Sequence, residues 1–96
     1  MASGEIKRYV VTFHFQEENL TDINELNNNL TRSGFTLTMS DDDGKVHELG
    51  INTFGLITAQ DEQDVRALAE GLGEAALGQK PEVEITTWEA WLADDS

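Results

Sequence analysis

The spacing of apolar residues switches repeatedly between a period of two and a helical period along the 96 residues of this chain. Alternating apolar and polar side chains predict strands, and recurrence every three to four residues predicts helices. The resulting order is strand, helix, strand, strand, helix, strand. A chain of this length makes one domain, so we expect a single α+β domain over residues 1–96 with frayed ends at 1–5 and 94–96.

Four segments have the strand pattern: 6–15, 35–40, 53–58 and 82–88. Tyr9, Val11 and Phe13 alternate with smaller residues in the first, which predicts a half-buried strand in the middle of a sheet. The stretch 45–52 is ambiguous and can extend a hairpin from the turn at 41–44.

Helical spacing of leucine, isoleucine and valine predicts helices at 20–33 and 61–72, and Gly34 gives the first a stop signal. Trp88, Trp91 and Leu92 predict a short C-terminal helix that folds back on the core. With right-handed crossovers, the order gives a ferredoxin-like βαββαβ fold. This fold has a four-stranded antiparallel sheet with two helices on one face.

The sheet face away from the helices is expected to be open and only mildly polar. It would carry Val10 and Ile57 beside Thr12, His14 and Thr86. Apolar side chains left in water on such a face favour self-association. We therefore expect a homodimer through this face.

Charge is the strongest compositional feature, because 19 acidic residues against 6 basic ones give a net charge of −13. Such a field repels nucleic acids and anionic membranes, and it attracts basic partners. The topology predicts two opposite poles. The basic pole holds candidate RNA-binding residues, Lys7, Arg8 and Arg32. The acidic pole holds candidate residues for docking a basic protein, Glu17, Glu18, Asp22, Asp41, Asp42 and Asp43.

The sequence also excludes several kinds of chemistry. It has no cysteine, which removes disulfides, zinc ribbons and thiol nucleophiles. With Gly44 as the glycine of a calcium loop, Met39 and Gly50 would occupy ligand positions, and both fail. We expect no metal and no cofactor. Without a membrane span or secretory signal, the expected location is cytoplasmic.

His47 is the one candidate for proton transfer, because the reference pKa of histidine lies near 6.5. It stands in Val46-His47-Glu48, with no orienting partner evident in the sequence. Fingerprints of phosphate loops, dinucleotide sites and serine hydrolases are lacking.

Three blocks resemble the GhoS-type antitoxin family: Tyr9-Val10-Val11-Thr12-Phe13, Asp41 with Gly44, and Leu49-x-x-Asn52-Thr53-Phe54. The resemblance covers residues 9–72, with a weaker echo at 85–88. It implies a ferredoxin-like fold similar to the CRISPR-associated Cas2 proteins. It also implies an antitoxin endoribonuclease that cleaves the messenger RNA of a small membrane toxin.

The family's activity is associated with arginine on the first helix. The corresponding stretch here, 24–28, has none, and Arg32 is the sole base of that helix. A second hypothesis therefore stays open. It is a non-enzymatic acidic protein that mimics nucleic acid and binds the basic groove of a partner, as phage inhibitors of CRISPR or restriction complexes do. A third is a small dimeric scaffold domain without chemistry.

Overall fold

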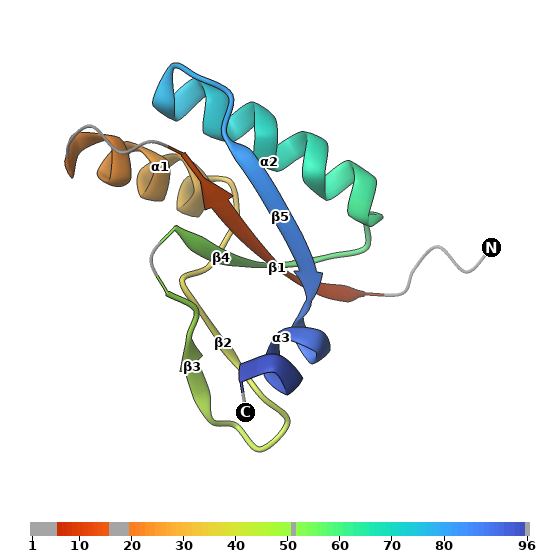
Figure 1. The fold of residues 1–96 in the computed structure, drawn as a ribbon. Coiled ribbons are helices and arrows are strands. Elements are labelled where there is room, and N and C mark those ends of the chain that lie inside the picture. The colour runs from red at the N-terminus through yellow and green to blue at the C-terminus, as the bar shows by residue number, and fades with distance from the viewer. Residues whose placement is uncertain (1–5, 16–19, 51, 96) are drawn as a thin grey trace.

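The central strand of the protein is β1 (Lys7–His14), which pairs antiparallel with a neighbour on each side. These neighbours are β4 (Thr53–Thr58) and β5 (Glu82–Thr87), and the sheet order is β4-β1-β5 (Figure 1). The computed structural model describes three stretches of the chain, residues 6–15, 20–50 and 52–95. The α+β class and the central place of the first strand are confirmed. Of the ends predicted to fray, residues 1–5 and 96 lie outside the described residues, whereas 94 and 95 belong to a C-terminal helix, so the prediction is wrong for these two.

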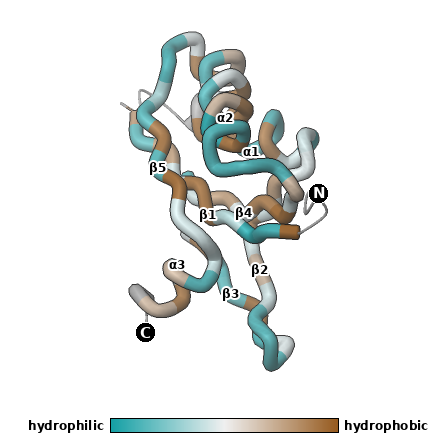
Figure 2. Tube along the Cα trace, turned by 90° about the vertical axis from the view of Figure 1, so that its right-hand side faces the viewer, coloured by the Kyte–Doolittle hydropathy of each residue, from teal (hydrophilic) through white to brown (hydrophobic). Residues whose placement is uncertain are grey.

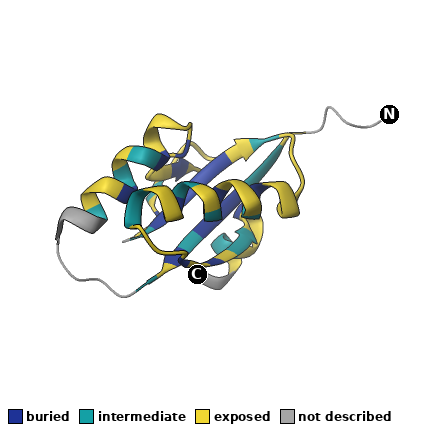
Figure 3. Ribbon diagram, turned by 90° about the horizontal axis from the view of Figure 1, so that it is seen from above, coloured by how far each residue is buried: buried dark blue, intermediate teal, exposed yellow. Residues whose placement is uncertain are grey.

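Two helices, α1 (Leu20–Arg32) and α2 (Glu62–Leu77), pack against each other on one face of this sheet (Figure 1). Leu26 and Leu30 lie one turn apart on α1, so both side chains enter the core. In the view from above, the buried residues form a band along the strands under the helices (Figure 3). The predicted packing of two helices on one face is confirmed.

The second helix is longer than the predicted 61–72, because it continues to Leu77. Gly73 lies inside it and is buried. A Cβ atom there would come within 2.6 Å of Cγ of Pro81, so glycine lets the chain before β5 pack directly on the helix. The helix ends where Gly78 adopts the left-handed conformation, with φ of 74°.

The predicted strand 35–40 is split in two, so the main sheet has three strands and not four. Thr36 forms an antiparallel bridge with Gly55 through two backbone hydrogen bonds of 2.8 Å. The chain then leaves the sheet edge. It pairs as β2 (Thr38–Ser40) with β3 (Val46–Glu48) in a separate hairpin. The fourth strand of the ferredoxin-like prediction is thus reduced to a bridge.

The β2–β3 hairpin leaves the edge because it packs on the sheet face opposite to α1 and α2 (Figures 1 and 2). Buried Met39 approaches Gly55 so closely that a Cβ atom there would lie 2.6 Å from the methionine sulfur. Met39 belongs to the same buried cluster as Val10. Burial of this apolar surface stabilises the crossing hairpin over a fourth paired strand.

The expectation of an open second face is wrong at its centre. α3 (Trp88–Asp95) begins directly after β5 and folds back, as predicted, so that Trp88 is 1% exposed. Together with Met39 and Leu49 it covers Val10, which is fully buried. Ile57 remains 59% exposed, and the homodimer through this face stays a prediction.

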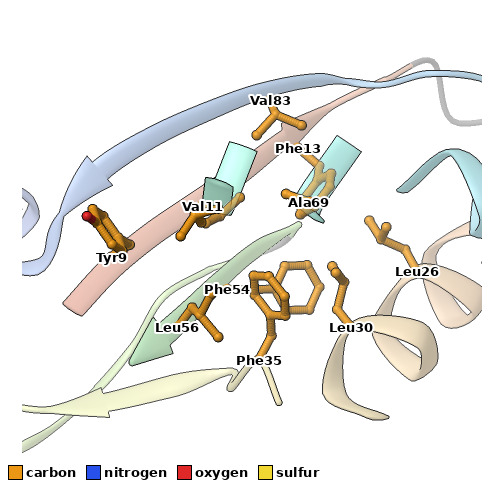
Figure 4. Packing of buried hydrophobic residues seen from close by; sticks show 11 residues of the cluster. Tyr9, Val11, Phe13, Leu26, Leu30, Phe35, Phe54, Leu56, Ala69 and Val83 are labelled. Carbon is orange, nitrogen blue, oxygen red and sulfur yellow. The ribbon is translucent and has the colours of Figure 1, made fainter. Parts of the chain in front are cut away.

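The main core lies between the sheet and the two long helices (Figure 4). Phe13 and Phe54 meet edge to face there, with ring centroids 5.7 Å apart. The described residues that make up this core come from β1, α1, β4, α2 and β5, and from the segment before the hairpin: Tyr9, Val11, Phe13, Leu26, Leu30, Phe35, Phe54, Leu56, Val65, Ala69 and Val83. The sheet therefore buries apolar groups on both faces. The β2–β3 hairpin contributes Met39 to the smaller cluster, on the face away from α1 and α2.

Candidate functional site

The turn of the β2–β3 hairpin brings a carboxylate to the one candidate for proton transfer. Oδ1 of Asp41 accepts backbone N–H groups from Asp43 and Lys45, both at 2.9 Å, which fixes the carboxylate at the tip. Oδ2 then lies 2.9 Å from Nε2 of His47. This orienting partner was missed in the sequence, although a turn between the two residues is the signal that pairs them.

The bond to His47 is the main cause that lowers the pKa of Asp41, and the N–H of Lys45 is the next. Asp41 is therefore an ionised acceptor, so Nε2 of His47 carries the proton between them. In a neutral imidazole, that tautomer leaves Nδ1 as the nitrogen with a lone pair. The side chains of His47 and Asp41 are 22% and 20% exposed, so the pair is shielded but reachable from solvent.

Two tryptophans of α3 hold the imidazole from the other side. The ring of His47 meets Trp88 edge to face at 5.6 Å and Trp91 at 6.3 Å. The two indoles lie three residues apart on the helix and stack with centroids 5.4 Å apart. Packing and a hydrogen bond thus orient His47 together, which is the arrangement that a general base requires.

Arg8 lies on the same face of the sheet as this pair. It projects from β1 toward α3, and its guanidinium is 2.8 Å from the carboxylate of Glu89. The N–H of Glu89 itself and then Arg8 lower the pKa of that carboxylate. A cavity of about 280 Å³ opens here, and the residues that line it are Arg8, Asp41, Asp42, Asp43, Trp88, Glu89 and Leu92.

The three candidate RNA-binding residues do not form one patch. Successive strand residues face opposite sides, so Lys7 points toward α2, where its Nζ lies 3.3 Å from Asp61. Lys7 and Arg8 both line a cavity of about 270 Å³ at the start of β1. Arg32 is exposed in the last turn of α1, on the helix side of the sheet.

The two predicted charge poles are not opposite, since Arg8 shares a cavity with the acidic hairpin tip. The prediction placed them at opposite ends because it treated 35–40 as a sheet strand, whereas the hairpin folds across the second face. Asp42 and Asp43 are exposed at that tip. Glu17, Glu18 and the side chain of Asp22 lie outside the described part of the chain.

A further cavity, of about 460 Å³, lies between α1 and the other face of the hairpin. Its lining comes from α1, β2, β3 and the loop that precedes β4: Ile23, Asn27, Leu37, Thr38, Glu48, Gly50 and Asn52. No pattern in the sequence predicts it, because its walls are brought together only when the hairpin leaves the sheet.

The described residues contain neither a cluster of metal ligands nor a membrane-spanning helix. Among these side chains, no group of three or more histidines or acids is arranged to hold a metal ion. Within the same stretches, no helix is long and apolar enough to cross a bilayer. The second histidine, His14, is exposed, and its Nε2 lies 3.0 Å from a carboxylate oxygen of Glu84.

Comparison with known proteins identifies a family that the chain matches. The family described as endoribonuclease GhoS matches residues 1–94 of the chain. The chain is also 59% identical over 91 residues to the uncharacterized protein YdiZ of Escherichia coli K12, covering 95% of each chain. The protein of that name in Escherichia coli O157:H7 matches with the same identity and coverage.

Proposed function

The chain belongs to the endoribonuclease GhoS family, and we propose that it cleaves single-stranded RNA with His47 as general base. The family match over residues 1–94 is the observation that carries this proposal. From the family resemblance, the proposal extends to an antitoxin that acts in the cytoplasm and cleaves the messenger RNA of a small membrane toxin.

The geometry around His47 supports the chemistry. Nδ1 of His47 accepts the proton of a ribose 2′-hydroxyl, while Asp41 holds Nε2 at 2.9 Å and stabilises the imidazolium that forms. The 2′-oxygen attacks the adjacent phosphorus and the bond to the 5′-oxygen breaks. The leaving oxygen takes a proton from water. The products are a 2′,3′-cyclic phosphate and a free 5′-hydroxyl.

Binding the RNA backbone falls to the few basic side chains. We propose that Arg8, Lys7 and Arg32 contact phosphates, with Arg8 nearest to the His47–Asp41 pair through the cavity that it shares with Asp41. Arginine suits this role because its planar guanidinium binds phosphate through two hydrogen bonds. Phosphate then competes with Glu89, which is 2.8 Å from Arg8 in the free protein.

A second candidate is the acidic interaction protein, which binds a basic groove of a nucleic-acid-binding partner. One observation favours it: Arg8 and Lys7 are each paired with a carboxylate, at 2.8 and 3.3 Å. The cavity beside Arg8 also carries four acidic residues, Asp41, Asp42, Asp43 and Glu89. Such a surface attracts cationic groups of a protein and repels phosphate.

The test is a cleavage assay on mixed cellular RNA and on short defined transcripts at low salt, with and without a chelator. The double variant Arg8→Ala/Arg32→Ala runs beside the wild type. Discrete fragments that end in 2′,3′-cyclic phosphate, and that the variant does not produce, are the expected result. If wild-type protein neither binds nor cuts RNA, the ribonuclease proposal fails and the search turns to a basic protein partner.

A further inference from the structure

The cavity between α1 and the β2–β3 hairpin has no part in the chemistry at His47. Its volume of about 460 Å³ lies within the range of small-ligand sites, about 300–1,000 Å³. It is open to solvent, and its lining includes two residues of α1 one turn apart, Ile23 and Asn27. This cavity, on the face of the hairpin away from His47, is large enough for a small ligand.

The lining combines apolar walls with a few polar groups. Ile23 and Leu37 supply apolar surface, and Leu37 is 48% exposed although it is a large hydrophobic residue. Asn27, Thr38 and Glu48 supply an amide, a hydroxyl and a carboxylate. Apolar walls with few convergent polar groups are typical of sites for flat, partly polar molecules.

Two of these polar side chains lie on the same face of the hairpin. Thr38 and Glu48 are direct cross-strand partners, so their side chains leave the same face of the ribbon. Met39 and His47 are the neighbouring pair and face the other way, toward the tryptophans. The pocket and the His47–Asp41 pair thus lie on the two faces of one ribbon, and an RNA strand that crosses its edge can contact both.

The charge of the lining decides the class of ligand. Glu48 disfavours a phosphate in the pocket, because the two negative charges repel each other. A carboxylate instead accepts hydrogen bonds from N–H groups. Unpaired bases of RNA present such donors on their Watson–Crick edge and apolar faces above and below the ring.

We propose that this cavity binds an unpaired nucleobase of RNA, with guanine preferred, an inference that rests on the proposed function. Guanine is the RNA base whose N1–H and exocyclic amine are adjacent donors, spaced to meet both oxygens of the Glu48 carboxylate. The amide of Asn27 donates to the guanine O6 atom, and Ile23 and Leu37 cover the faces of the ring. The pocket would therefore bind the RNA strand preferentially at a guanine.

The helix sequence agrees with a binding role for Asn27. Asparagine is a poor helix former, yet three in succession occupy the middle of α1. Asn28 is exposed, whereas Asn27 is half-buried at the pocket wall. Asn27 is thus the asparagine of this run whose amide lies at the pocket.

The test uses the five neutral nucleosides guanosine, inosine, adenosine, cytidine and uridine, so that phosphate repulsion plays no part. Backbone amide shifts of the full chain are followed by NMR during each titration. We expect guanosine to shift Asn27, Leu37 and Gly50. Inosine lacks the exocyclic amine and should bind about tenfold more weakly, because one hydrogen bond to a charged group is lost.

Glu48→Gln should lower the affinity for guanosine about tenfold, since the amide keeps one acceptor and loses the charge. The matched control is Glu82→Gln, an exposed glutamate of β5 outside the pocket, which should bind guanosine as the wild type does. Circular dichroism checks that both variants fold.

The pocket assignment is overturned if the nucleosides shift residues elsewhere, or if all five nucleosides bind equally. RNA cleavage without guanosine binding would remove the base pocket and leave the ribonuclease standing. Guanosine binding at Asn27 and Gly50 without RNA cleavage would keep the pocket and contradict the ribonuclease.

Discussion

Nε2 of His47 and Oδ2 of Asp41 lie 2.9 Å apart across the turn of a hairpin that does not belong to the main sheet. Both residues precede β4, and the hairpin that carries them shares a buried cluster with Trp88 of α3 through Met39. The pair therefore depends on the complete fold. Loss of the packing between hairpin and α3 should disturb it even when the main core stays intact.

The carboxylate of Asp41 predicts a pH dependence of stability. Its pKa is lowered in the folded state, first by His47 and then by the N–H of Lys45. A lowered pKa contributes stability above the unfolded value near 3.8, and that contribution is lost as pH falls through the folded pKa. The free-energy difference between wild type and Asp41→Asn should therefore hold at pH 5 and shrink below pH 4.

Urea unfolding between pH 5 and pH 2 measures this difference. Asp42→Asn, at the exposed tip of the same hairpin, is the matched control and should track the wild type more closely. A difference for Asp41→Asn that stays constant to the lowest pH would show that the hydrogen bonds to its carboxylate do not stabilise the fold.

Two glycines of α2 should respond to alanine in opposite directions. A Cβ at Gly71 meets nothing within 4 Å, so Gly71→Ala should stabilise the protein by about 0.5–1 kcal/mol through helix propensity. A Cβ at Gly73 would lie 2.6 Å from the rigid ring of Pro81 and 3.1 Å from Phe13. Gly73→Ala should cost about 1–3 kcal/mol, as overpacking does. Equal effects in chemical denaturation would contradict this packing of β5 on α2.

The burial of Trp88 predicts how much the packing of α3 on the second face contributes to stability. Its side chain is 1% exposed above Val10, so Trp88→Ala should destabilise the protein by about 3–5 kcal/mol. Trp91→Ala removes the half-buried stacking partner and should cost clearly less. Thermal and urea unfolding followed by circular dichroism compares them. Similar losses for both would mean that α3 does not pack as described.

RNA binding should depend on single basic side chains. Arg8→Gln and Arg32→Gln should each weaken binding, and each should reduce the slope of log affinity against log salt by about one. Lys80→Gln removes an equal charge beside Glu70, far along the chain from the proposed site, and serves as control. Fluorescence anisotropy with a labelled single-stranded RNA gives the slopes. Unchanged slopes for both arginine variants would exclude these side chains as phosphate contacts.

The central strand and the two long helices could be predicted because local patterns determine them. Tyr9, Val11 and Phe13 lie on one face of β1 and all enter the main core, as their alternation indicates. Leu26 and Leu30 do the same on α1. The burial of these residues can be predicted from the local sequence alone.

The hairpin and the candidate site could not be predicted in the same way. The segment 35–40 alternates like a strand. Its partner, however, is decided by contacts of Met39 with Gly55 and by the cover that Trp88 provides. The Asp41 partner of His47 was hidden because a run of three aspartates resembles a solvated turn. Only the bonds from Asp43 and Lys45 single out the first of them.

The most direct test of the account compares the two histidines in RNA cleavage. His47→Asn should lower the cleavage rate by at least about 100-fold, the usual contribution of a general base. His14→Asn, which changes an exposed histidine also paired with a carboxylate, should cleave at the wild-type rate. If folded His47→Asn protein cuts RNA as fast as the wild type, His47 is not the base and the assignment of the site is wrong.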